Sequence, residues 1–96
     1  MITNDPLNSA IADALALIEA NPKPTDENLR ALSVRLALAH AATEDEINQL
    51  AVESFQETIE DMQADTVPEH RAYLFDQMTT GLMAYEVQLL LDGEKE

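Results

Sequence analysis

The stretch TEDEINQLAVESFQETIEDM, residues 43–62, holds the clearest amphipathic pattern of the chain and decides its fold class. Its apolar residues recur three or four positions apart, which is the period of an α-helix and not that of a β-strand. This spacing predicts a core-facing helix side made of Ile47, Leu50, Ala51, Phe55, Ile59 and Met62. Thr43 and Glu46 have the spacing of a capping box, so the helix is expected to begin at residue 44.

The same period recurs on both sides of this stretch, and prolines interrupt the chain between the periodic segments. The apolar stripe of the first segment is Leu7, Ile11, Ala14, Leu15 and Ile18, and that of the second is Leu29, Leu32, Leu36 and Ala39. The expected helices span residues 6–20, 26–41, 44–63 and 67–92. We therefore predict an all-α fold, a compact four-helix bundle-like domain with a long C-terminal helix, in which residues 1–96 form one acidic domain.

Residues with capping side chains or flexible backbones mark where these helices are expected to begin and end. Thr25 is the expected N-cap of the second helix, and Thr66 with Glu69 repeats the capping box before the fourth. Gly93 can take the left-handed conformation that ends a helix. Gly81 lies inside the C-terminal helix, where it either breaks the helix or lets a neighbouring helix approach closely. We expect the unbroken helix.

The composition excludes several classes of partner and site. The 96 residues include 19 Asp or Glu and only 5 Lys or Arg, which gives a formal net charge of −14. This charge repels nucleic acid and anionic membranes, so we expect neither as a direct partner. The absence of cysteine excludes disulfides, thiolate zinc sites and thiol catalysis. Because the N-terminus lacks a basic signal-peptide start and no apolar run approaches the roughly 18 residues of a membrane span, we expect a cytoplasmic protein.

The negative charge is concentrated in one part of the chain. Between Arg35 and Arg71 there is no Lys or Arg, whereas nine residues are Asp or Glu. On the third predicted helix, the acids that share an arc or border it are Glu46, Glu53, Glu57, Glu60 and Asp61. Two interpretations stay open, because such a face either docks on a basic site of another protein or is a solvated face that supplies solubility.

A second apolar stripe is the other unusual feature of the C-terminal helix. Its expected core stripe is Leu74, Met78, Leu82, Tyr85 and Leu89, whereas Met83, Val87 and Leu90 cluster on nearly the opposite side. Either this helix is central and wrapped by the other three, or the second stripe contacts a partner or a second copy of the chain. Val34 and Leu38 also lie outside the stripe of the second helix, which favours a central, well-covered position for that helix.

No pattern typical of a catalytic or metal site is present. His40 is expected to be partly buried near the C-terminus of the second helix, and His70 to be exposed in the first turn of the fourth. No H-x-x-x-H or E-x-x-H spacing supports a zinc or di-iron site, and the segment 44–46 lacks the glycine of a calcium loop. The serines have no matched base, and the glycines are isolated. We therefore expect no enzymatic activity, no cofactor and no metal.

Three functional hypotheses follow from these features. In the first, the chain is a small acidic inhibitor or regulator that docks on the basic surface of a nucleic-acid-handling protein. In size, acidity and lack of a catalytic motif it resembles phage-encoded inhibitors, including anti-CRISPR proteins and DNA mimics, although no residue motif carries this resemblance. In the second, it is a helical adaptor, chaperone or small subunit that binds through the apolar stripe of its last helix, with a homodimer as one form. In the third, it is a passive structural domain of a larger assembly.

Overall fold

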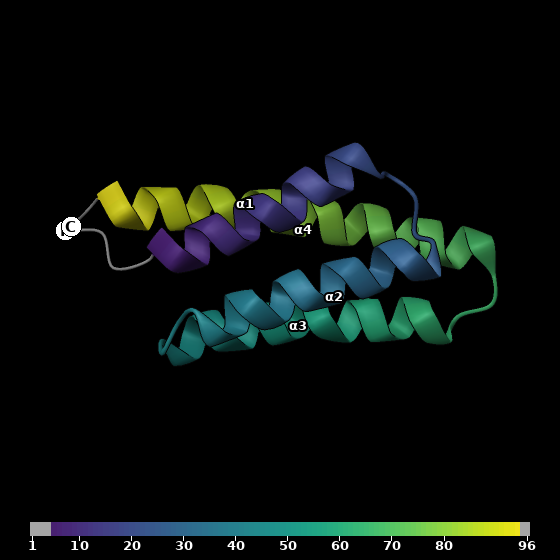
Figure 1. The fold of residues 1–96 in the computed structure, drawn as a ribbon, viewed down its shortest axis with the longest axis horizontal. Helices are drawn as coiled ribbons and strands as arrows, with labels where there is room; N and C mark the ends of the chain where they lie inside the picture. Colours follow the sequence, from purple (N-terminus) through teal and green to yellow (C-terminus); the bar gives the residue numbers. More distant parts are fainter. Residues whose placement is uncertain (1–4, 95–96) are drawn as a thin grey trace.

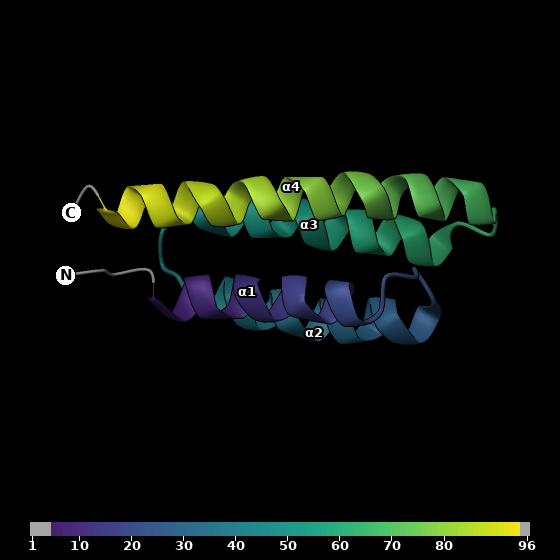
Figure 2. The same cartoon turned by 90° about the horizontal axis from the view of Figure 1, so that it is seen from above.

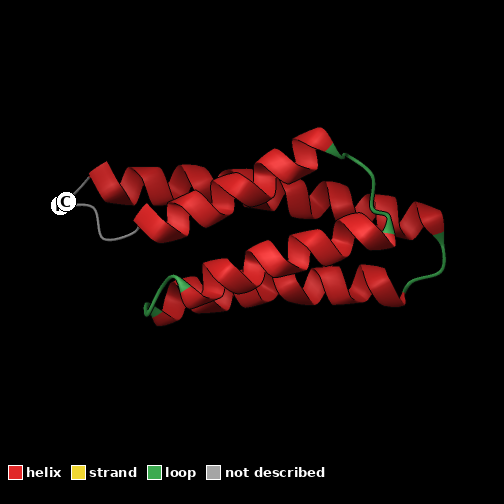
Figure 3. Cartoon of the chain, viewed as in Figure 1, coloured by secondary structure: helices red, strands yellow, loops and turns green. Residues whose placement is uncertain are grey.

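The computed structural model describes residues 5–94, which form four α-helices joined by short loops (Figure 1, Figure 3). The helices are α1 (Asp5–Ala20), α2 (Asp26–Ala41), α3 (Glu46–Ala64) and α4 (Pro68–Glu94). This architecture confirms the predicted all-α fold with four helices and a long C-terminal helix. Each helix begins and ends within about two residues of its expected bounds.

Each helix packs against two others, so the four helices form a closed ring. Packing joins α1 to α2, α2 to α3, α3 to α4, and α4 back to α1, whereas the diagonal helices make no close backbone approach within the described residues. In Figure 2, α1 and α2 form one layer and α3 and α4 form the other, with successive helices running in opposite directions. The domain measures 44 × 21 × 17 Å and is elongated along the helix axes.

The core lies inside this ring and is built from aliphatic side chains of all four helices. Among the residues whose exposure the structure describes, no polar or charged residue is buried as a whole. The largest fully buried side chains are Leu7, Ile11, Leu29, Leu32, Leu36, Val52, Ile59, Met62, Leu82 and Leu89. The predicted stripe of α2 is fully buried and that of α1 is buried except for the half-buried Leu15, because a period of 3.6 residues keeps those side chains on the inward face.

The predicted inward face of α3 is wrong in its N-terminal half. Ile47 is 77% exposed and Leu50 is 58% exposed, whereas Val52, which the sequence pattern left out, is fully buried. At about 100° per residue, Ile47 lies about 140° around the helix from Val52, so the two side chains cannot both face the core. α3 packs only against α2 and α4, so only the side of α3 that faces these two helices is buried. Val52 and Ile59 lie on that side.

Two predicted capping boxes are also wrong, because α3 and α4 begin later than their threonines require. Asp45 is the N-cap of α3, and its Oδ1 accepts hydrogen bonds from the backbone N–H groups of Ile47 (2.9 Å) and Asn48 (3.4 Å). Thr43 lies outside the helix, where its hydroxyl accepts from the Asp45 backbone N–H. Before α4, Asp65 Oδ1 accepts from the backbone N–H of Val67 at 2.8 Å.

Thr25 caps α2 as predicted, since its hydroxyl accepts from the Asn28 backbone N–H at 3.2 Å. The carbonyl of Val67 accepts from the backbone N–H of Arg71, which places the start of α4 at Pro68. At the far end, α4 continues through Gly93 to Glu94, so Gly93 is not the left-handed cap that the sequence predicted. Capping side chains therefore mark the starts of α2 and α3, and only at α2 is the capping residue the one that the sequence pattern favours.

The long helix α4 is unbroken, and Gly81 is where another helix approaches it. A Cβ atom on Gly81 would lie 3.1 Å from Cε1 of Phe55 on α3, closer than an ordinary van der Waals contact. The ring of Phe55 also packs against Tyr85, with 5.9 Å between the ring centroids. The Tyr85 hydroxyl donates a hydrogen bond to Oδ1 of Asn48 at 2.9 Å. These contacts confirm that Gly81 permits close packing of α3 against α4.

Candidate protein-interaction surfaces

The five acidic residues that the sequence singled out are all exposed on the outer side of α3. We call them the acidic row: Glu46, Glu53, Glu57, Glu60 and Asp61. The structure leaves them together on the solvent side of α3, because at about 100° per residue none of them points along the inward arc at Val52 and Ile59; Glu60 lies nearest that arc, about 80° from Val52. Their backbone is held by a regular helix, so the carboxylates have a fixed spacing along its axis.

No Lys or Arg within residues 5–94 forms an ion pair with the acidic row. Its one ion-pair contact is with His40 at the end of α2, whose Nε2 lies 2.8 Å from Oε2 of Glu53. His40 is half-buried in the last turn of α2, as the sequence predicted, but its carboxylate partner was not predicted. The other four carboxylates therefore have no cationic partner within residues 5–94, and they are exposed to solvent.

An exposed leucine interrupts the acidic row, and the sequence analysis missed it. Leu50 lies four residues after Glu46 and three before Glu53, so its side chain stands between these carboxylates on the helix surface. The sequence pattern predicts a core position for Leu50, whereas in the structure its side chain is 58% exposed, because the inward side of α3 is set by the positions of α2 and α4. The acidic row thus offers apolar contact as well as charge.

The second apolar stripe of α4 is also exposed. Met83, Val87 and Leu90 are 53–56% exposed, and these three residues form what we call the seam. Because α4 packs against α1 and α3 but not against α2, the interpretation of α4 as a central helix is wrong. The same is true of α2, whose Val34 and Leu38 are 59% and 62% exposed. Neither outward face is covered by another helix of the described chain.

Two neighbouring hollows between α1 and α4 adjoin the seam. One, of about 340 Å³, is lined by Leu15, Ile18, Glu19, Thr79, Met83 and Glu86. The other, of about 290 Å³, is lined by Ile18, Pro22, Pro24, Ala72, Phe75, Asp76 and Thr79. Because Ile18 and Thr79 line both hollows, the two lie next to each other, and we call them together the α1–α4 groove.

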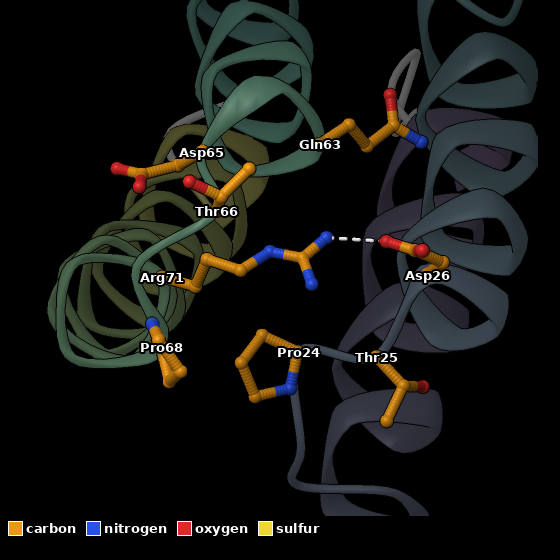
Figure 4. A pocket seen from close by; sticks show the side chains of 8 residues that line it. All are labelled: Pro24, Thr25, Asp26, Gln63, Asp65, Thr66, Pro68 and Arg71. Carbon is orange, nitrogen blue, oxygen red and sulfur yellow. Dashed lines mark hydrogen bonds and ion pairs between the residues drawn. The ribbon is translucent and has the colours of Figure 1, made fainter.

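A third hollow, of about 480 Å³, lies at the end of the bundle where α2 and α4 begin (Figure 4). Arg71 reaches into it, and its Nη2 pairs with Oδ1 of Asp26 on α2. The Arg71 Nε donates to the carbonyl of Met62 at the end of α3, at 2.7 Å. The hydrogen bond from Arg71, and then its positive charge, lower the pKa of Asp26. The arginine of this hollow is therefore already engaged by the protein's own groups.

The structure places the second histidine and tests the described residues for a metal site. His70 is exposed, as predicted, and its Nδ1 lies 3.3 Å from Oδ2 of Asp65. Nowhere in residues 5–94 do three His, Asp or Glu side chains gather so that they could hold a metal ion. Burial, with a smaller effect from Asp45, raises the pKa of Tyr85 to about 12, so this phenol stays protonated at neutral pH. None of the four described helices combines the length and the apolar character needed to cross a bilayer.

The exposed features are thus the acidic row on α3, the outward face of α2, and the α1–α4 groove with its seam. Comparison with known proteins adds no relative, because no family model, no curated protein and no solved structure matches the chain.

Proposed function

We propose that the chain is a non-enzymatic protein–protein interaction module, a small acidic inhibitor or regulator that docks on the basic surface of a nucleic-acid-handling protein. The partner is a protein, and neither nucleic acid nor a membrane is bound directly. This proposal puts the chain in the functional class of phage-type inhibitors, anti-CRISPR proteins and DNA mimics. A partner of this kind would be met in the cytoplasm.

The observation that carries the proposal is a row of exposed carboxylates with no Lys or Arg paired to it in the described part of the chain. Ordinary surface helices intersperse Lys among Glu at spacings of three and four residues, which neutralises the face locally. From the helical rise, the distances along the helix axis between successive residues of the series Glu46, Glu53, Glu57 and Glu60 are about 10, 6 and 4.5 Å. These gaps are of the order of the phosphate spacing along a nucleic-acid strand.

The mechanism that follows is competition for a basic site. Lys and Arg side chains that hold phosphates would contact the carboxylates of the acidic row instead, and Leu50 would add an apolar contact between Glu46 and Glu53. The net charge of −14 would speed the encounter and make binding depend strongly on salt.

The test uses two charge-matched variants of the immobilised protein. Glu57→Gln with Glu60→Gln removes two charges from the acidic row, whereas Asp13→Asn with Asp92→Asn removes two exposed charges elsewhere. Each variant is used to capture proteins from a nucleic-acid-free cell lysate at low and high salt, and a DNA or RNA oligonucleotide is then added as competitor.

We expect the wild type and the Asp13/Asp92 variant to retain the same nucleic-acid-binding protein at low salt and to release it to the oligonucleotide. The Glu57/Glu60 variant should not retain it. Capture that is unaffected by the Glu57/Glu60 substitutions, or that the oligonucleotide does not reverse, would contradict the proposal.

A further inference from the structure

The outward face of α2 and the α1–α4 groove are two uncovered surfaces with opposite charge. The first turn of α2 carries Asp26 and Glu27, and beyond it α2 has no Asp or Glu but carries Arg30 and Arg35. At about 100° per residue, Glu27 lies on the arc of Val34 and Leu38, at the N-terminal end of the outward face. This contrasts with the rest of a chain that carries 19 acidic residues. From these two surfaces we infer that the chain associates head to tail, with α2 of one copy seated in the α1–α4 groove of the next.

The outward face of α2 carries exposed apolar side chains that no other helix within residues 5–94 covers. Val34 and Leu38 are four residues apart and form one exposed ridge. At about 100° per residue, Arg30 lies on one side of this ridge and Arg35 on the other. The guanidinium groups of both arginines donate to backbone carbonyls of α2, and neither forms an ion pair with a carboxylate within residues 5–94. An apolar ridge between two cations fits an apolar groove with anionic edges.

The α1–α4 groove has those properties. Leu15, Ile18 and Phe75 supply apolar walls, and the exposed Met83 adds a flexible side chain that adapts to an incoming surface. The charged residues that line its two hollows are all acidic: Glu19, Asp76 and Glu86. From Ala72 to Glu86 the groove follows α4 for about 21 Å, compared with about 24 Å for the full length of α2.

The arrangement of the four helices allows this contact only between two copies of the chain. Because α2 and α4 are diagonal, the outward face of α2 points away from the groove of its own chain and can reach only that of another copy. The two contacting surfaces differ, so the contact is heterologous, and an open assembly has one free α2 face at one end and one free groove at the other. The contact uses neither α3 nor the acidic row, so it stands or falls independently of the proposed function.

The test uses two single substitutions that each block one surface and add one negative charge. Leu38→Asp blocks the α2 face, and Met83→Asp blocks the groove; both side chains are more than half exposed, so both variants are expected to fold. Light scattering and sedimentation are measured at protein concentrations on the order of 100 μM. The salt is about 0.15 M, where the Debye length of about 8 Å screens the overall repulsion between copies. Circular dichroism checks the fold. If Leu38→Asp fails to fold, Val34→Asp blocks the α2 face instead, and if Met83→Asp fails to fold, Glu86→Lys places a cation in the groove instead.

The expected pattern is specific to a head-to-tail contact. The wild type should form dimers and larger species as its concentration rises, and each variant alone should stay monomeric. An equal mixture of the two variants should form a 1:1 dimer and nothing larger, because the mixture contains one intact α2 face and one intact groove per pair.

Three outcomes would overturn the inference. A monomeric wild type at the highest concentration would leave both surfaces to other partners. Dimers formed by Leu38→Asp alone would indicate a symmetric contact through the seam. Dimers formed by Met83→Asp alone would indicate a symmetric contact through α2.

Discussion

Arg71 and Asp26 form an ion pair that joins α4 to α2, the two helices that face each other across the diagonal of the ring. The same guanidinium donates to the carbonyl of Met62, so one side chain holds the ends of three helices. Arg71 is only 19% exposed, whereas Asp26 is 72% exposed. The arginine therefore contributes mainly through its part-buried hydrogen bond and less through the exposed pair.

Arg71→Met should lower the free energy of unfolding by about 1–2 kcal/mol, because it leaves the Met62 carbonyl without its charged donor. Asp26→Asn should have a much smaller effect at neutral pH, since its carboxylate is exposed. Urea unfolding of both variants measures the difference. Equal losses from the two substitutions would show that the ion pair, and not the carbonyl contact, is the stabilising part.

The Asp26 contact should also give the protein a specific sensitivity to acid. Because Arg71 lowers the pKa of Asp26 below the ordinary value of 3.8, the folded state binds fewer protons than the unfolded state near that pH. The stabilisation is therefore present above the ordinary pKa and is lost as the pH falls through the lower pKa of the folded state. Urea unfolding at a series of acidic pH values should show the difference between wild type and Asp26→Asn shrinking there. A difference that stays constant with pH would be inconsistent with the lowered pKa.

Ionisation of Tyr85 should lower the free energy of unfolding at alkaline pH. Its pKa is raised from 10.0 to about 12, so the folded state retains the phenolic proton that the unfolded state releases first. Stability from this group is present below pH 10 and decreases as the pH rises through about 12. Tyr85→Phe should cost about 1 kcal/mol at neutral pH, through the lost hydrogen bond to Asn48, and should flatten the alkaline decrease. Thermal unfolding between pH 8 and 12 measures both effects, and an unchanged alkaline slope would argue against the assignment.

Gly81→Ala should change stability by less than about 0.5 kcal/mol. The gain in helix propensity, about 1 kcal/mol, is offset because the new methyl group would crowd the ring of Phe55. In a Phe55→Leu background the crowding is relieved, and the same substitution should stabilise by about 1 kcal/mol. A double-mutant cycle measured by urea unfolding tests this, and additive effects would mean that the ring and the methyl group do not interfere.

Asn8→Ala should stabilise the protein by about 1 kcal/mol. The side-chain oxygen of Asn8 is buried and accepts no hydrogen bond within residues 5–94, so its removal relieves a desolvation cost. Ser9→Ala is the matched control, because Ser9 is exposed in the same helical turn and gains only helix propensity, a few tenths of a kcal/mol. Comparison of their thermal midpoints separates the two effects. Equal gains would indicate that Asn8 carries no burial penalty.

The sequence predicts the buried side of a helix correctly where a regular apolar stripe marks that side. In α2, Leu29, Leu32 and Leu36 repeat on one side, and that side is buried. In α3, apolar residues lie on two sides, with Ile47 and Leu50 on one and Val52 on the other. The positions of α2 and α4 determine that the side of Val52 is buried. Periodicity within one helix does not contain that information, because it depends on contacts between helices.

The candidate surfaces also differ in how far the sequence predicts them. The acidic row comes from one helix, so its spacing was visible in the sequence before any packing was known. The α1–α4 groove combines Ile18 with Thr79, residues from opposite ends of the chain, and no local pattern predicts that they meet. The outward face of α2 was misread as a covered one, since an apolar stripe on a second side of a helix has the same sequence signature whether it is buried or exposed.

The order of helices around the ring has a consequence for how the chain folds. Three of its four helix contacts join consecutive helices and form between residues close in sequence, which favours rapid folding. Only the contact of α1 with α4 closes a loop that spans nearly the whole chain, and its entropic cost makes it the contact we expect to form last. The groove lies along that contact, so the surface proposed to receive another copy is completed only in the final step of folding.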